Sequence, residues 1–222
     1  MDSKFVHLYT PMHFPHEQEV NKYKEWLAEE IKKGVQLCER SLFIFDELDH
    51  IPAGLLDTIS SFIDFHANID SVDYRKSIFI FLSNVGGREI NDVAYEHWKN
   101  GSRERRDNIP LEKLEKAMMN AAYNVQGGMW QSKLISRSLI NVFIPFLPME
   151  RRHVTKCIQD NIRSRKILPY GVSEKEVIDV VLNKLTWFPE EAPLYSTAGC
   201  KHVHDKINQV VRSRKKHGHE EL

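Results

Sequence analysis

Apolar positions in the first half of the chain fall into short continuous runs and longer runs with helical spacing. The short runs are residues 4–9, 41–45 and 77–82, and the last two are rich in Ile and Phe. We expect a strand in each, the last two buried on both faces of a sheet. Apolar residues recur every three or four positions over residues 20–38 and 53–66, which predicts two helices between the strands. Strands separated by helices predict a parallel sheet with crossover helices.

The pattern changes near residue 147. Helices are expected near residues 91–99 and 110–124, and a fourth strand at residues 141–146. Pro145 and Pro148 bracket a short connection, and only helical patterns follow, at residues 150–165, 173–185 and 199–214. We therefore predict an α/β domain at residues 1–147 and a small all-helical domain at 148–211. Residues 212–222 are charged and nearly free of apolar side chains, which predicts a disordered tail.

Two acidic residues, Asp46 and Glu47, directly follow the second predicted strand. Ligands of parallel sheets bind at the carboxyl ends of the strands, and carboxylates there suggest a cation or a reacting group. In the Walker B arrangement of P-loop ATPases, the first acid holds Mg²⁺ through its water shell and the second activates the attacking water. A core strand that leaves the sheet through an acidic turn would give the same pattern.

Two further residues fit a nucleotide site. Asn84 follows the third predicted strand, so it would lie beside Asp46 and Glu47 if the two strands are neighbours. There its amide could hydrogen-bond the water and the terminal phosphate, the role called sensor 1. Lys201 lies in the first turn of the last predicted helix, a position unfavourable to a cation unless an anion such as phosphate is near. A turn-forming asparagine and a solvated lysine are the simpler alternatives.

Several motifs in order along the chain carry a resemblance to a known family. They are His13-Phe14-Pro15-His16, the 41–49 and 79–87 stretches, Phe143-Ile144-Pro145-Phe146-Leu147-Pro148 and Gly199-Cys200-Lys201. With them the chain resembles the torsins, AAA+ ATPases related to Clp-type chaperones, from about residue 5 to residue 201. The resemblance implies ATP and Mg²⁺ as cofactors, with Asp46 on the metal, Glu47 and Asn84 in catalysis, and Asn84 and Lys201 (sensor 2) at the nucleotide. It also implies action in membrane and protein-quality homeostasis.

The same resemblance implies two features of the second domain. In torsins the sensor 2 cysteine pairs with an upstream cysteine, so Cys157 and Cys200 are a candidate redox-responsive disulfide. Glu190 and Glu191 match the glutamate pair whose partial loss disables the human member in inherited dystonia. We expect an interface role for this pair, and expect a deletion to rotate the following helix and Lys201. Unpaired thiols and solvated glutamates are the alternatives.

Two parts of a complete AAA+ ATPase site are missing, and the first of them is a departure from the torsin pattern. It contains neither Gly-x-x-x-x-Gly-Lys-Ser/Thr nor the torsin variant ending in Asn, the loop whose backbone N–H groups cradle phosphates. We expect a strand near the middle of the sheet to be missing with that loop, and the fragment to fold poorly alone. Torsins also lack an arginine finger. Their activators are membrane-anchored lumenal partners of the lamina-associated polypeptide type, which supply one.

Composition and the chain ends bear on compartment and partners. Thirty-one basic and 31 acidic residues cancel, so nothing predicts nucleic-acid binding, and no apolar run is long enough to span a bilayer. The final His219-Glu220-Glu221-Leu222 is close to endoplasmic-reticulum retrieval signals. Asn100-Gly101-Ser102 is a glycosylation acceptor sequence. Together with the resemblance, these features predict the lumen of the endoplasmic reticulum and the nuclear envelope, with homo-oligomerisation left open.

Two other functions compete with ATP hydrolysis. The first is a non-catalytic form that binds the activating partner without hydrolysing ATP, since the phosphate-binding loop is absent from the sequence. The second is a metal-dependent hydrolase in which Asp46, Glu47 and Asp49 bind a cation without a nucleotide.

Overall fold

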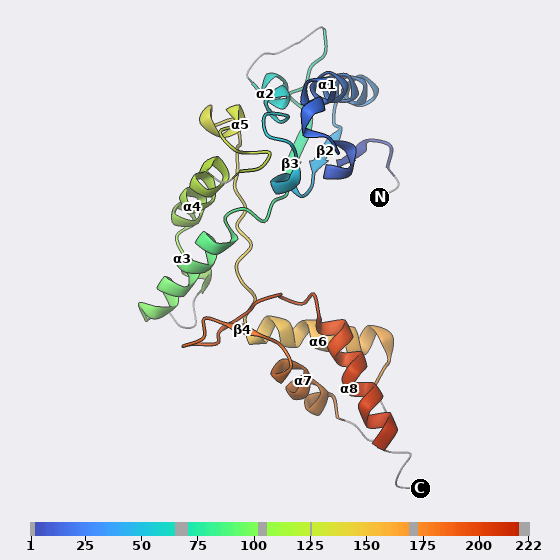
Figure 1. Cartoon of the computed structure of the whole chain (residues 1–222), viewed down its shortest axis with the longest axis vertical. Coiled ribbons are helices and arrows are strands. Elements are labelled where there is room, and N and C mark those ends of the chain that lie inside the picture. Colours follow the sequence, from blue (N-terminus) through green and yellow to red (C-terminus); the bar gives the residue numbers. More distant parts are fainter. Residues whose placement is uncertain (1–2, 65–70, 102–105, 125, 169–172, 218–222) are drawn as a thin grey trace. The chain divides into compact units, whose positions relative to one another are not determined.

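The computed structural model describes residues 3–64, 71–101, 106–124, 126–168 and 173–217 (Figure 1). The chain divides into two compact units, Met1–Phe146 and Leu147–Leu222, each of which is described by itself. The first unit combines a parallel sheet with helices, and the second is mainly helical.

In the first unit, the chain alternates between strands and helices as its apolar pattern predicts. The strands are β1 (Val6–Tyr9), β2 (Leu42–Phe45) and β3 (Ile78–Phe81), and the helices are α1 (Val20–Leu37), α2 (Asp57–Ile63), α3 (Gly87–Lys99), α4 (Leu111–Asn124) and α5 (Lys133–Ser136). All strand pairs are parallel, in the order β1-β2-β3, and Val6, Leu42 and Ile78 share one register position. The predicted α/β fold class is therefore confirmed.

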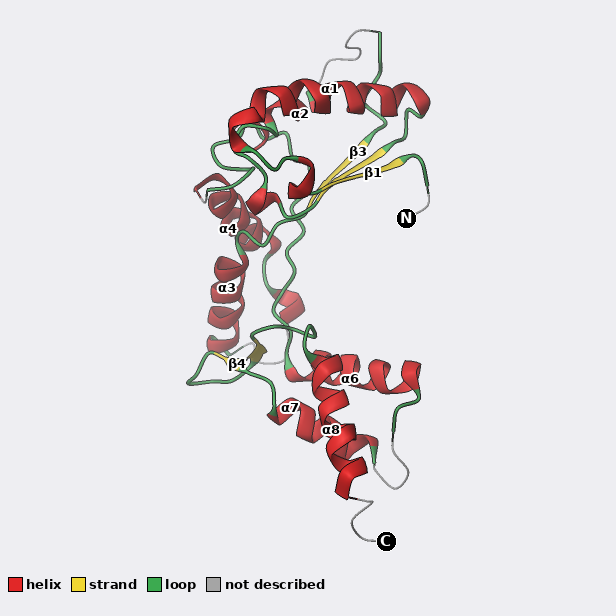
Figure 2. Cartoon of the chain, turned by 45° about the vertical axis from the view of Figure 1, so that its right-hand side comes forward, coloured by secondary structure: helices red, strands yellow, loops and turns green. Residues whose placement is uncertain are grey.

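One face of the sheet carries two columns of stacked rings. His7, Phe43 and Phe79 form the first, with ring centroids 4.9 and 5.1 Å apart. Tyr9, Phe45 and Phe81 form the second, at 5.0 and 5.6 Å. Helix α1 lies along one side of the sheet in Figure 2, and its Leu27 and Ile31 belong to the same buried core as Tyr9, Phe43 and Phe45. The core thus fixes the register in which β2 and β3 end side by side.

The opposite face of the sheet carries aliphatic side chains that are largely open. Leu8 is 45 % exposed, Ile78 56 % and Ile80 38 %. The expectation that the third strand is buried on both faces is therefore wrong. Ile44 of the central strand lies on the same face and is only 8 % exposed, so the open side chains are those of the two outer strands. Within the described residues, no strand pairs with the outer edge of β3.

The fourth strand expected at residues 141–146 is also absent. This segment has no regular secondary structure, and Val142, Ile144 and Phe146 are 62, 68 and 85 % exposed. A strand needs a neighbouring ladder to satisfy its N–H and C=O groups. No strand in the described part of the chain lies beside this segment. Since β1, β2 and β3 are hydrogen-bonded without a gap, any missing strand belongs outside these three.

The second unit packs three helical segments around an aliphatic core. They are α6 (Arg151–Arg165), α7 (Glu174–Asn183) and α8 (Val203–His217), and the core consists of Val154, Ile158, Ile162, Val177, Val181, Val203, Ile207 and Val210. The expectation of no further strand is wrong, because β4 (Trp187–Phe188) and β5 (Tyr195–Ser196) form a short antiparallel pair. The helix expected from residue 199 begins at Val203, and the charged stretch expected to be disordered from residue 212 continues α8 to His217. Arg and Lys are good helix formers, which favours this extension.

Candidate functional site

The two acids after β2 lie in a turn, residues 46–49, that we name the acid turn. Its backbone is hydrogen-bonded to the ends of both neighbouring strands. The Asp46 N–H donates to the Tyr9 carbonyl (2.9 Å), and the Leu48 N–H donates to the Leu82 carbonyl just beyond β3 (3.0 Å). These bonds fix the turn at the carboxyl edge of the sheet, where ligands of parallel sheets bind.

The carboxylates of the acid turn have different surroundings. Asp46 is half-buried, and its Oδ1 accepts the Glu47 N–H at 2.9 Å. Glu47 has a left-handed backbone with φ 53°, which costs a residue other than glycine about 1–2 kcal/mol. Its side chain is exposed, and among the described residues it has no hydrogen-bond or ion-pair partner. One acid is thus held in place, and the other is presented to solvent by a strained backbone.

Asn84 contacts the acid turn through a residue other than the two predicted acids. Asp49 Oδ1 accepts the Asn84 N–H and the Ser83 hydroxyl, both at 3.3 Å. The strands β2 and β3 are neighbours, as the placement of Asn84 beside Asp46 and Glu47 requires, but the contact that Asn84 makes with this turn is to Asp49. The linking role of Asp49 was not predicted from the sequence, where Asp49 is considered only as a metal ligand of the alternative hydrolase. The available signal was its position two residues after Glu47, facing a strand end that carries a hydroxyl and an amide.

Asp49 is expected to make the stability of the first unit depend on pH in the acid range. Partial burial raises the pKa of Asp49, but hydrogen bonds from its own N–H and from Asn84, together with nearby His50, outweigh burial and hold the pKa below its usual range. A depressed carboxyl pKa adds stability above the ordinary aspartate range, and that stability is lost as the pH falls through the lowered value. We expect Asp49→Asn to flatten the decline of unfolding free energy below about pH 4. Urea titrations between pH 2 and 7 measure it.

Asp92→Asn, on the exposed face of α3, is the matched control for Asp49→Asn and should leave the acid decline unchanged. An Asp49→Asn protein with the wild-type pH profile would contradict the electrostatic role of Asp49.

Two glycines after α4 pack against the backbone of the acid turn. The Gly128 N–H donates to the Leu48 carbonyl at 2.8 Å. A Cβ on Gly128 would lie 2.9 Å from the same carbonyl oxygen and 3.3 Å from Ile51 Cβ. Gly127 approaches as closely, since a Cβ there would lie 3.0 Å from Asp49 Cα. Only residues without a side chain fit here, so these glycines are part of the support for the site, which the sequence analysis did not identify.

Gly128→Ala should therefore destabilise the first unit by about 1–3 kcal/mol, the usual cost of forcing an extra carbon into packed surroundings. Gly87→Ala is the control, because a Cβ there meets nothing within 4 Å. Urea denaturation followed by near-UV circular dichroism compares the two. Equal denaturation midpoints for the Gly128→Ala and Gly87→Ala proteins would show that Gly128 does not pack against the acid turn.

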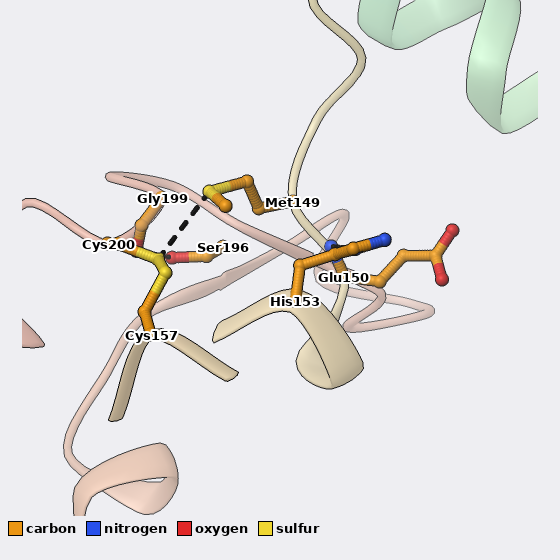
Figure 3. The surroundings of a disulfide bond; sticks show 7 residues. All are labelled: Met149, Glu150, His153, Cys157, Ser196, Gly199 and Cys200. Carbon is orange, nitrogen blue, oxygen red and sulfur yellow. Dashed lines mark hydrogen bonds between the residues drawn. A yellow bond between two sulfur atoms is a disulfide. The ribbon is translucent and has the colours of Figure 1, made fainter. Parts of the chain in front are cut away.

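The second unit contains the remaining predicted residues. Lys201 is exposed in the turn before α8, and it has no partner among the described side chains. Cys157 of α6 and Cys200 form a disulfide with a Cα–Cα distance of 6.2 Å, which confirms the pairing implied by the resemblance (Figure 3). Cys38, in the first unit, is a free thiol.

Glu190 and Glu191 are exposed in the connection between β4 and β5. The element that follows them is β5 and not a helix. A deletion would therefore act first on the β4–β5 pairing, where the Leu194 N–H donates to the Phe188 carbonyl (3.1 Å). We expected the deletion of one glutamate to rotate the following helix directly, and this expectation is corrected because β5 lies between the pair and α8.

The remaining sequence predictions concern surface features. Asn100 is exposed at the end of α3, while Ser102 of its acceptor triplet and the final residues 219–222 lie outside the described residues. In the part of the chain that is described, no three His, Cys, Asp or Glu side chains converge as a metal cage would. Nor does any described helix have the length and apolar character to cross a membrane.

Comparisons with known proteins agree with the motifs. The family model Torsin matches residues 1–45, and the model of the Torsin-1A C-terminal domain matches residues 149–209. A Torsin-like protein of Caenorhabditis elegans is 42 % identical over 207 residues, which are 93 % of this chain and 57 % of the relative. A closed-state cryo-EM reconstruction of Hsp104 with ATPγS and FITC-casein gives a TM-score of 0.43 at 12 % identity, over 82 % of this chain and 28 % of that one.

The chain thus spans little more than half the length of its worm relative. Both ends of the match carry torsin sequence, and the parallel sheet with its helices has the α/β architecture expected of an AAA+ domain. This chain belongs to the torsin family.

Proposed function

We propose that this chain carries the magnesium-and-water half of a torsin-type AAA+ ATPase site. The observation that carries the proposal is the acid turn, which is hydrogen-bonded to the ends of both adjacent strands and presents Glu47 to solvent. Family membership supports ATP as the nucleotide.

Each residue has a distinct role in this proposal. Asp46 would hold the water shell of Mg²⁺, since Glu47 N–H occupies only one of its oxygens. Bound Mg²⁺ would neutralise charge on the phosphates. Glu47 would orient the attacking water and accept its proton, and the Asn84 amide would hydrogen-bond the same water and the terminal phosphate. Lys201, from the second unit, would pair with phosphate as sensor 2.

The site also needs a phosphate-binding loop, which these 222 residues do not contain. The unpaired outer edge of β3 and the open aliphatic face around Ile78 and Ile80 support the proposal that a strand–loop–helix segment packs there. Its strand would extend the ladder beside β3, and its helix would cover the aliphatic side chains, as parallel sheets require on both faces. The loop between them would then lie at the edge occupied by the acid turn.

The wider assignment rests on the family. We propose action in membrane and protein-quality homeostasis in the lumen of the endoplasmic reticulum and the nuclear envelope, with a membrane-anchored activator of the lamina-associated polypeptide type supplying the arginine finger. The Cys157–Cys200 disulfide supports the proposed lumenal location, because disulfides persist in oxidising compartments. Exposed Glu190 and Glu191 are the proposed contact with that partner. Asn100 is a proposed glycosylation site. The proposal also includes contact between copies of the chain in a homo-oligomer.

The second candidate function is a non-catalytic form that binds the activator without hydrolysing ATP. The absent phosphate-binding loop favours it for the 222 residues alone. Capture of the chain by the immobilised lumenal domain of the activator, with and without ATP and Mg²⁺, separates the two. Capture that requires ATP would support the ATPase and rule out the nucleotide-independent form, whereas equal capture in both conditions would favour that form. The described residues contain no converged cluster of metal ligands that would support the metal-dependent hydrolase.

A further inference from the structure

The carboxylate of Asp49 collects hydrogen-bond donors from the loop that follows β3. Its Oδ1 accepts the Ser83 hydroxyl and the Asn84 N–H, both at 3.3 Å. The Ser83 oxygen in turn accepts the Val85 N–H at 3.1 Å. Consecutive residues of this loop are therefore tied, directly or through Ser83, to one carboxylate, and these bonds fix the backbone that carries the Asn84 side chain.

Asp49 is itself held in place. Its side chain is only 19 % exposed, and its Oδ2 lies 3.4 Å from His50 Nε2. Its backbone packs closely against Gly127, where a Cβ would lie 3.0 Å from Asp49 Cα. Both oxygens of the carboxylate thus have a neighbour, and the main chain has little room to shift toward Gly127. Asp49 is therefore a fixed acceptor beside Asn84.

The two ends of an asparagine amide are chemically opposite. Nδ2 carries two protons and donates, whereas Oδ1 only accepts. An ionised carboxylate also only accepts, so it attracts Nδ2 and repels Oδ1. Burial raises the pKa of Asp49, but hydrogen bonds from its own N–H and from the backbone and side chain of Asn84, with His50 nearby, lower it overall. A donor lowers a carboxyl pKa and a carbonyl oxygen does not. Asp49 therefore selects the orientation in which Nδ2 faces the carboxylate and Oδ1 faces away from it.

We propose that Asp49 is a positioning residue, which orients the Asn84 amide so that Oδ1 accepts a hydrogen bond from the attacking water. The proton of the water that Glu47 does not take up would make this bond, and the second Nδ2 proton would remain for the terminal phosphate. Asp49 itself would touch neither the water nor the phosphate. The inference deepens the proposed ATPase and rests on it, because the orientation of the amide affects a rate only if water is activated beside it.

Amide hydrogen exchange in the full chain, without nucleotide, tests the contact itself. In isotope-labelled protein observed by NMR, one Nδ2 proton of Asn84 should exchange with water about tenfold more slowly than those of Asn183, which is exposed at the end of α7. Asp49→Ala should remove this protection and speed the exchange of the Asn84 N–H. Asp92→Ala, on the exposed face of α3, is the control and should change neither.

Turnover by the chain joined to a torsin phosphate-loop segment, with the activator present, tests the consequence. Asp49→Ala should lower the rate of phosphate release about tenfold and leave ATP affinity within about twofold, because the oriented amide serves the water more than the bound nucleotide. Asp49→Asn keeps an acceptor oxygen at the same place, so it should retain most of the wild-type rate. Equal losses in Asp49→Ala and Asp49→Asn would assign the effect to charge and overturn the positioning role.

The remaining outcomes separate this inference from the proposed function. Wild-type Asn84 side-chain protons that exchange as fast as those of Asn183 would overturn the inference without any substitution. So would turnover that Asp49→Ala leaves unchanged, or that falls together with ATP affinity. A wild-type joined chain that binds ATP and releases no phosphate, although Asn84 is protected, would instead overturn the ATPase, and with it the kinetic role of Asp49.

Discussion

Replacing Glu47 by Gln should abolish ATP hydrolysis and leave ATP binding unchanged. The protein to use is the chain joined to a torsin phosphate-loop segment, with the activator present. Glutamine keeps the size of the side chain but cannot accept a proton from water, and loss of a general base costs about 10²–10⁴-fold in rate. Release of inorganic phosphate measures turnover, and a fluorescent ATP analogue measures binding.

Glu112→Gln is the matched control for Glu47→Gln. Glu112 is exposed at the start of α4, so its replacement should preserve both turnover and binding. Turnover by the Glu47→Gln protein at the control rate would show that Glu47 does not activate water.

Phe43→Ala should have the largest effect on stability. The Phe43 ring is fully buried and lies between His7 and Phe79, with centroids 4.9 and 5.1 Å away. Removing a buried phenyl ring costs about 3–5 kcal/mol in lost burial and residual cavity, a large share of the stability of a small domain. Urea denaturation followed by near-UV circular dichroism should show the first unit unfolding at a much lower denaturant concentration.

Phe146→Ala is the control, since Phe146 is 85 % exposed and its removal should change the midpoint little. Equal effects of the two substitutions would contradict the stacked columns as the core of the sheet.

The sequence predicts those parts of the fold in which local pattern and tertiary environment agree. The helical spacing of residues 20–38 predicts α1 closely, and Leu42–Phe45 is a strand with its acids at the carboxyl edge. The proximity of Asn84 to that edge also follows, because neighbouring parallel strands end together. The pairing of Cys157 with Cys200 was accessible only through family resemblance, since spacing in sequence does not give distance in space.

The sequence-based predictions failed where the structure of a segment depends on another segment packing or pairing with it. The apolar pattern of residues 141–146 is that of a strand, but no ladder lies beside it among the described residues, so the segment stays irregular and exposed. Ile78 and Ile80 have the composition of a buried strand and face an uncovered side. The Gly128 N–H is hydrogen-bonded to the acid turn, and the Asp49 carboxylate links this turn to Ser83 and Asn84. Neither contact leaves a periodic signal in the sequence.

The central claim is that Asp46 places magnesium beside the nucleotide. The most direct test is to titrate ATP, with Mg²⁺ and with EDTA, into the wild-type and Asp46→Asn forms of the chain joined to the phosphate-loop segment. We predict that Mg²⁺ strengthens ATP binding by the wild type and that Asp46→Asn removes most of this gain while leaving binding in EDTA unchanged. An equal Mg²⁺-dependent gain in both proteins would contradict the assignment of the acid turn as the magnesium half of the site.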